Sequence, residues 1–451
     1  MRIKQKLDTL VQKIVDAVSG NGVMQEENTA DGTARAFEPI PDIALKAAEE
    51  SVVLLKNINN TLPVKDDEVI SVFGRCQIDY FYVGYGSGGD VNAPYQVNMI
   101  KGLKDCNANI YSPVLNLYED WCEKNPVSHG FWGHWPMCFP EMELEERIVK
   151  SAANNSHSAI VVIGRAAGED RENKLEQGSY YLTDNEIKML DLVTAHFNKV
   201  TVIMNCGNIV DMAWTEKYGD KITALVYAWQ CGMESGNALA NVLMGKTTPS
   251  GKLPCTIARN YEDYSSSANF GGKDYNNYAE DIFVGYRYFE TFCRDKVLYP
   301  FGFGLSYTDF EIKPASFERK DDKFYITADV KNVGNVSGKE VVQLYVKAPQ
   351  GELSKAERSL VAFGKTNELA PDESESIHFE FSLYDISSFD DCSKSPHKYA
   401  YVIESGEYTF YIGNSVRTDM KAGSVQLEDM VVEQLDEVCG IKDLSLIHIS
   451  E

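Results

Sequence analysis

The sequence has few of the features that place a protein in a membrane or on nucleic acid. No apolar run approaches the length needed to span a bilayer. Basic residues number 43 against 67 acidic ones, and the formal net charge of -24 would repel phosphate backbones and anionic lipid surfaces. We therefore expect no membrane partner and no nucleic-acid partner, whereas a neutral substrate would meet little electrostatic penalty.

Paired cysteine motifs are also lacking. Ten cysteines are scattered between Cys76 and Cys439 without CxxC spacing, so a zinc site has no support and we expect neither a metal nor a cofactor. The segment Met1–Gly20 has apolar residues at helical spacing instead of the continuous apolar core of a secretion signal. We expect this segment to form an amphipathic helix. Without a secretion signal, we expect a cytoplasmic location, which is a reducing compartment, and therefore free thiols at the cysteines.

Short apolar runs alternate with helical stretches over the first half of the chain. These runs are EVISVFG at 68–74, SAIVVIG at 158–164, KVTVIMN at 199–205 and ITALVYAW at 222–229. Residues 44–58 place apolar side chains on one helical face and predict a helix, and Thr183 with Glu186 forms a capping-box pattern. The fold expected is α/β, a mostly parallel sheet sandwiched by helices as in a flavodoxin-like protein.

After Tyr307 the apolar period changes to two. Phe324, Ile326, Ala328 and Val330 alternate with other residues, and later segments keep this alternation, which predicts an all-β sandwich. From Glu428 an acidic, helical segment is expected. The last residues, LSLIHISE, resemble a translated sequencing adapter, so we expect the chain to be truncated. The expected domains are an N-terminal helix and linker (1–40), the α/β domain (41–308), the β-sandwich (309–427) and a tail (428–451).

Four ordered motifs resemble glycoside hydrolase family 3. They are LKAAEESVVLLKN near the start, GEDREN with GSYYLT at 168–183, WQCGMESGNALANVLMGKTTPSGKLPCT at 229–256, and EDIFVGYRYFE with LYPFGFGLSYTDF at 280–310. The resemblance covers about residues 41–430 and implies the family's α/β sandwich followed by its fibronectin type III-like domain. It also implies retaining hydrolysis of terminal β-D-glucosyl residues, in a β-glucoside or oligosaccharide, by two carboxylates.

The acidic loop at 163–183 follows a buried strand, where open α/β sheets place functional residues. By the family resemblance, Glu169 in this loop is the general acid/base. Arg171 would hold the loop through Asp170 or a nearby carboxylate. Two alternatives stay open: Glu169 is an ordinary solvated carboxylate, or Glu172 takes the role.

Two other segments are candidate sugar contacts. The glycine-rich segment 82–92 lets backbone approach a ligand, and Ser87 in it could hydrogen-bond a sugar hydroxyl, although a structural turn fits equally well. The aromatic insert 128–142 contains Trp132 and Trp135, which suit stacking on a sugar, although packing beneath a long loop is the commoner role. Asp211, a carboxylate elsewhere in the α/β region, is interpreted as a helix cap or ion-pair partner.

The family's (β/α)8 barrel has no counterpart in this sequence, and no SDW-like motif for its nucleophilic aspartate occurs. The chain therefore resembles the reversed-order subgroup in which the barrel follows, and the missing barrel is the partner we expect. The chain alone should hydrolyse little. A homodimer remains possible. Two other functions stay open, a β-xylosidase and a non-catalytic carbohydrate-binding module. A flavodoxin-like nucleotide-binding protein ranks last, because the sequence lacks GxGxxG and P-loop motifs.

Overall fold

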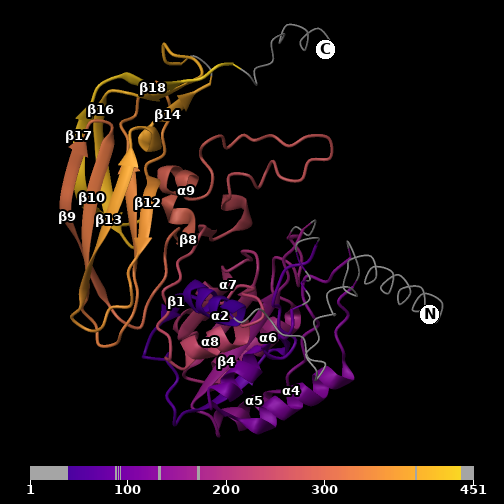
Figure 1. Ribbon diagram of the computed structural model, residues 1–451. Helices are drawn as coiled ribbons and strands as arrows, with labels where there is room; N and C mark the ends of the chain where they lie inside the picture. Colours follow the sequence, from indigo (N-terminus) through magenta and orange to yellow (C-terminus); the bar gives the residue numbers. More distant parts are fainter. Residues whose placement is uncertain are drawn as a thin grey trace, which may run out of the picture. The chain divides into compact units, whose positions relative to one another are not determined.

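The computed structural model describes residues 39–86, 89, 91, 93–130, 134–169, 173–391 and 394–437. The helix predicted at Met1–Gly20 lies outside these residues. The chain divides into two compact units, one of Met1–Leu253 with Gly304–Thr308 and one of Pro254–Phe303 with Asp309–Glu451 (Figure 1). In the described ranges, no helix combines the length and the apolar character needed to cross a membrane. The domain boundaries given above stay predictions.

The first unit is built on a six-stranded, mostly parallel sheet, which confirms the predicted α/β class. Its strands, in spatial order, are β1 (Val53–Asn57), β6 (Ala224–Tyr227), β5 (Val200–Cys206), β4 (Ser158–Arg165), β2 (Val69–Phe73) and β3 (Asn109–Ile110). Strands β2 to β6 run parallel, and β1 pairs antiparallel with β6. Every residue of β4 and β5 is buried, as expected where helices cover both faces of a sheet.

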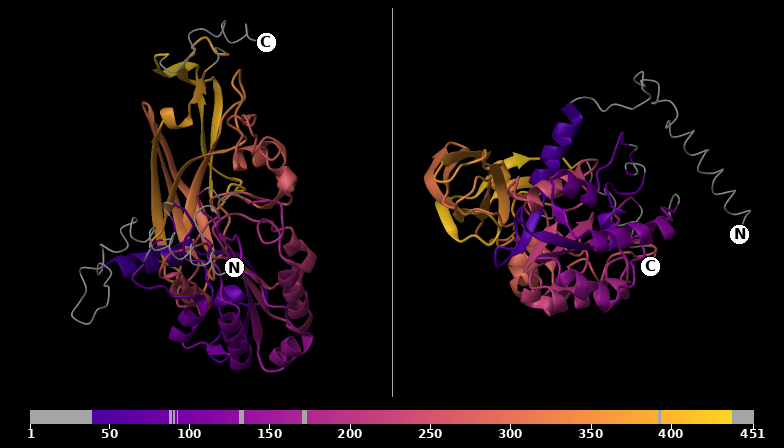
Figure 2. Two further views of the ribbon diagram at one scale, coloured as in Figure 1. Left: turned by 90° about the vertical axis from the view of Figure 1, so that its right-hand side faces the viewer. Right: turned by 90° about the horizontal axis from the view of Figure 1, so that it is seen from below.

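Helices flank this sheet in two groups (Figure 2). One group is α2 (Pro39–Ser51), α3 (Met99–Asp105) and α8 (Ser235–Leu243), and the other is α4 (Ser112–Lys124), α5 (Glu146–Ala153) and α6 (Asp184–His196). Apolar residues of α3 and α8 share one buried cluster with sheet residues such as Ile160 and Ile203. The helix α6 begins with the predicted capping box, in which Thr183 Oγ1 accepts from Glu186 N and Glu186 Oε2 accepts from Thr183 N.

The helix predicted over residues 44–58 is wrong in its second half. The helix α2 ends at Ser51, and the following residues form β1, in which Val53 and Leu54 are fully buried. A continuous apolar run is typical of a strand covered on both sides, and β6 supplies the hydrogen-bond partners that this backbone needs. The periodicity of the helical segment concealed the point at which the strand begins.

The helices α3 and α8 approach each other closely at two glycines. A Cβ placed on Gly102 would lie 2.1 Å from the Gly236 carbonyl oxygen. Gly102→Ala would normally favour a helix, but here we expect it to lower the free energy of unfolding by roughly 1–3 kcal/mol because the backbones must move apart. Urea denaturation of the chain measures this change. Lys101→Ala, at the exposed neighbouring position, should change it by less than about 0.5 kcal/mol, and equal effects would contradict the packing argument.

The second unit contains the predicted β-sandwich. One sheet has the order β13 (Ser374–Ser382), β10 (Lys323–Asn332) and β9 (Phe310–Lys320), and the other has the order β12 (Ser359–Lys365), β11 (Val341–Lys347), β16 (Gly406–Gly413) and β17 (Met420–Leu427). The predicted alternation along β10 is confirmed, because Phe324, Ile326, Ala328 and Val330 are all buried. These side chains belong to one core that both sheets share.

The helix expected from Glu428 is wrong. Residues Met430–Gln434 form strand β18, which pairs antiparallel with β15 (Ala400–Ile403). Met430 and Val432 pack against the sandwich core, and their period of two is that of a strand. The acidic composition of the segment concealed this short alternation.

Candidate active site

The candidate active site lies where two loops meet at the carboxyl edge of the parallel sheet. The strand order reverses between the neighbouring strands β2 and β4, and ligands bind at such switch points in open α/β sheets. The loop after β2 and the loop after β4 form a short parallel bridge there. Tyr85 N donates to Ala167 O at 2.8 Å, and Glu169 N donates to Tyr85 O at 2.9 Å. The backbone of Glu169 is therefore held by the neighbouring loop.

Glycines allow this close approach. Gly86 has φ +110°, and a Cβ placed on it would lie 2.4 Å from Glu169 Cβ and 3.0 Å from Glu169 Oε2. A Cβ on Gly168 would lie 2.5 Å from Tyr85 O. The side chain of Glu169 consequently lies over Gly86, and Glu169 is an exposed residue. A carboxylate is thus presented outward from a loop whose backbone is fixed.

Of the five predicted site residues, the described part of the chain contains Glu169 and Trp135. Ser87, Arg171 and Trp132 lie outside it, as does the competing candidate Glu172. Trp135 is 6% exposed, and its ring stacks on that of Tyr85 with centroids 5.4 Å apart and planes 5° from parallel. This position agrees with packing beneath a loop, the alternative that the sequence left open. Trp135 supports Tyr85, which in turn holds Glu169 N.

A buried ion pair anchors the other end of the loop after β4. Arg165, the last residue of β4, donates from Nη1 and Nη2 to the two carboxylate oxygens of Glu186, both at 2.7 Å. Arg165 also donates to the carbonyl oxygens of Ser179 and Tyr181, each at 3.1 Å. One guanidinium therefore joins the strand end, the loop and the first turn of α6. The sequence showed the role of Glu186 in the cap but not this pairing.

Asn205 is a second positioning residue that the sequence did not indicate. It lies in β5, is fully buried, and accepts from Phe81 N at 2.8 Å. Its amide donates to Phe81 O at 2.9 Å and to Trp229 O at 2.7 Å. Asn205 thus joins the loops after β2 and β6 across the sheet edge. The only sequence signal was a polar residue at the end of an apolar run.

A second carboxylate, that of Glu141, contacts the start of the loop after β2. Glu141 Oε2 accepts from Arg75 N at 2.7 Å and its Oε1 accepts from Met142 N at 2.8 Å. Burial raises the pKa of Glu141 from 4.5 to about 7, against the lowering effect of these two hydrogen bonds, and nearby Glu186 raises it further. Glu141 is therefore a structural carboxyl that titrates near neutrality.

The raised pKa of Glu141 predicts a pH-dependent stability. Because the folded pKa exceeds the unfolded one, the stabilising effect is present below about pH 4.5 and is lost as the pH rises toward about 7. Glu141→Gln should remove this dependence. Between about pH 4.5 and about pH 7, the free energy of unfolding of the wild-type chain should therefore fall by up to roughly 3 kcal/mol more than that of the variant. Denaturant unfolding at a series of pH values measures the difference, and parallel curves would contradict it.

The first unit is thus an open α/β sheet with an exposed carboxylate on a loop at its switch point, and the second unit contains a β-sandwich. The family description "Glycosyl hydrolase family 3 C-terminal domain" matches residues 52–307, and "Fibronectin type III-like domain" matches residues 340–416. The chain belongs to glycoside hydrolase family 3, with that C-terminal domain followed by the fibronectin type III-like domain.

Several β-glucosidases are similar to the chain. A β-glucosidase of Ruminococcus albus is 45% identical over 397 residues, which are 87% of this chain and 42% of that protein. The crystal structure of a β-glucosidase from Paenibacillus barengoltzii matches with a TM-score of 0.87 and 46% identity, over 89% of this chain and 45% of that one. β-Glucosidase 3B from Thermotoga neapolitana with α-D-glucose matches at 0.79 and 33% identity, over 87% and 55%. The chain thus spans about half the length of these relatives.

Proposed function

We propose that this chain forms the acid/base half of a retaining β-glucosidase and that Glu169 is its general acid/base. The observation that carries the proposal is the presentation of Glu169, an exposed carboxylate on a loop fixed at the switch point of the sheet. The β-glucosidases that match the chain support the substrate class. The finer assignment to terminal non-reducing β-D-glucosyl residues, rather than xylosyl residues, is part of the proposal.

In a retaining mechanism Glu169 would act twice. As an acid it would donate a proton to the glycosidic oxygen while a second carboxylate, about 5 Å away, attacks the anomeric carbon. As a base it would then take a proton from the water that releases the sugar. A side chain that exchanges a proton with both a sugar oxygen and water needs access to solvent, which Glu169 has, and a fixed backbone, which Tyr85 supplies.

The second carboxylate is proposed to come from a (β/α)8 barrel, because the sequence has no SDW-like motif. Around the sugar, Arg171 would position the acidic loop, and Ser87 and Trp132 would contact the substrate. Trp135 would act through its stack on Tyr85. The homodimer and the cytoplasmic location stay predictions.

A chimaera tests this proposal. In it the present chain replaces the matched segment of the Ruminococcus albus β-glucosidase, with which it is 45% identical. We expect the chimaera to hydrolyse 4-nitrophenyl β-D-glucoside and the chain alone to give no turnover above that of a Glu169→Ala chain. Robust hydrolysis by the chain alone would contradict the proposal that this chain supplies one catalytic carboxylate and a barrel supplies the other. A correctly folded but inactive chimaera would contradict the assignment of this chain as a β-glucosidase half.

A further inference from the structure

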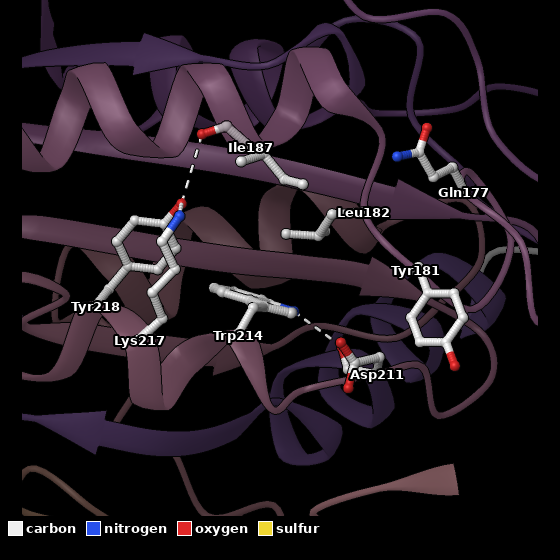
Figure 3. Close-up of a pocket in the computed structure, with 8 residues that line it drawn as sticks. All are labelled: Gln177, Tyr181, Leu182, Ile187, Asp211, Trp214, Lys217 and Tyr218. Carbon is white, nitrogen blue, oxygen red and sulfur yellow. Dashed lines mark hydrogen bonds between the residues drawn. The ribbon is translucent and has the colours of Figure 1, made fainter.

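A hollow with a volume of ≈ 330 Å³ lies beside the acidic loop, between its last residues, α6 and the short helix α7 (Trp214–Tyr218) (Figure 3). Tyr181 and Leu182, at the end of the loop that carries Glu169, form one side. Asp211 and Trp214 form the other. The volume is at the lower limit for small-molecule pockets and suits a ligand of one ring.

The aromatic side of this hollow is held in place before any ligand binds. The indole Nε1 of Trp214 donates to the Asp211 carbonyl oxygen at 2.8 Å, as Figure 3 shows. The ring of Tyr218 lies edge-on to it, with centroids 6.3 Å apart, and the Tyr218 hydroxyl donates to Asp191 at 2.9 Å. A fixed ring loses little conformational freedom when a ligand stacks on it.

Asp211 supplies the polar side. Its Oδ1 accepts from Ala213 N at 3.1 Å, but Ala213 is the N-cap residue of α7 and no side chain caps that helix, so the capping role expected of Asp211 is wrong. Burial raises the pKa of Asp211, and this hydrogen bond lowers it. Within the described part of the chain Asp211 has no ion-pair partner, so its half-buried carboxylate retains capacity to accept hydrogen bonds.

We propose that this hollow binds one pyranose unit, as a free monosaccharide or as the terminal unit of an oligosaccharide. An aromatic ring that packs on the apolar face of a sugar, next to a carboxylate that accepts from its hydroxyls, is the chemistry that recognises a neutral sugar. An anion is disfavoured because Lys217, the cation at the rim, is already paired with Asp191 at 3.0 Å. The inference rests on the proposed function in one respect, which is that glucose is taken as the pyranose to be tested.

The hollow and the acidic loop are connected through the backbone. Asp211 N donates to Tyr180 O at 3.0 Å, which joins the loop after β5 to the loop after β4. A sugar bound between Tyr181 and Asp211 would therefore contact both loops. This is a binding site beside the catalytic loop and requires no catalytic group.

Isothermal titration of the full chain with glucose and with cellobiose, up to about 100 mM, tests the inference. We expect millimolar binding of at least one sugar. Trp214→Ala and Asp211→Asn should each weaken it at least roughly tenfold, whereas Trp214→Phe, which keeps an aromatic ring, should weaken it by less than about threefold. Thermal unfolding of each variant shows whether it is folded, and Asp211→Asn keeps the test decisive if Trp214→Ala does not fold.

The matched control is a second hollow of ≈ 350 Å³ in the same unit, lined by one aromatic ring and no carboxylate. Tyr111→Ala in that hollow should leave sugar binding unchanged. The absence of binding to the wild-type chain would overturn the inference, and so would equal losses in Trp214→Ala and Tyr111→Ala. The titration measures binding and needs no turnover. A failure of the sugar-binding inference can therefore be distinguished from a failure of the proposed function, which an inactive chimaera would show.

Discussion

Glu169→Ala in the chimaera is expected to slow cellobiose hydrolysis by roughly 10²–10⁴-fold while slowing 2,4-dinitrophenyl β-D-glucoside cleavage far less. A glucose leaving group needs a proton as the glycosidic bond breaks, whereas dinitrophenolate leaves without one. Glu169 is an exposed residue, and its side chain lies over Gly86. The measurement is kcat/KM on both substrates.

The control for this prediction is Glu176→Ala, an exposed carboxylate on the same loop. It should leave kcat/KM on both substrates within about twofold, because a solvated loop carboxylate contributes little to stability. Equal losses on cellobiose and on the aryl glucoside in Glu169→Ala would show that the residue does not protonate the leaving group. The role would then pass to another carboxylate, such as Glu172.

Arg165→Met is expected to lower the free energy of unfolding by roughly 3–5 kcal/mol. The side chains of Arg165 and Glu186 are 1% and 7% exposed, so removing the guanidinium leaves a buried carboxylate without its counter-charge. The carbonyl oxygens of Ser179 and Tyr181 each lose the hydrogen bond from Arg165 at the same time, although Tyr181 O still accepts from Gly178 N. Guanidinium chloride denaturation of the chain measures the loss.

Lys188→Met provides the comparison for this ion pair. Lys188 pairs with Glu143 at 2.7 Å, but their side chains are 45% and 72% exposed, so solvent screens the interaction. Its removal should lower the free energy of unfolding by less than about 1 kcal/mol. If Arg165→Met behaved like Lys188→Met, the buried pair would not be the anchor of the acidic loop.

The parts of the fold that local chemistry specifies could be predicted from the sequence. The run at 158–164 is apolar and β-branched, and it forms the fully buried strand β4. The capping box of Thr183 and Glu186 depends on two residues three positions apart, and it is present as predicted. The period of two along β10 likewise needs only neighbouring residues. By contrast, β1 was taken for helix because its pairing with β6 is remote in sequence.

The site depends on contacts that no local pattern contains. Glu169 could be proposed only through the resemblance of its loop to a known family. The bridge from Tyr85 to Glu169 joins residues from two loops, and the partner of Arg165 follows 21 positions later. The raised pKa of Glu141 results from burial, which the sequence around it does not indicate. These properties appear only when the chain is folded.

The most direct test of the central claim is the product that the Glu169→Ala chimaera forms from 2,4-dinitrophenyl β-D-glucoside in sodium azide. Loss of the base slows the attack of water on the glycosyl-enzyme, but azide carries its own charge and needs no base. The account predicts faster turnover in azide and a β-glucosyl azide product, identified by NMR. If azide neither raises the rate nor appears in the product, Glu169 is not the acid/base.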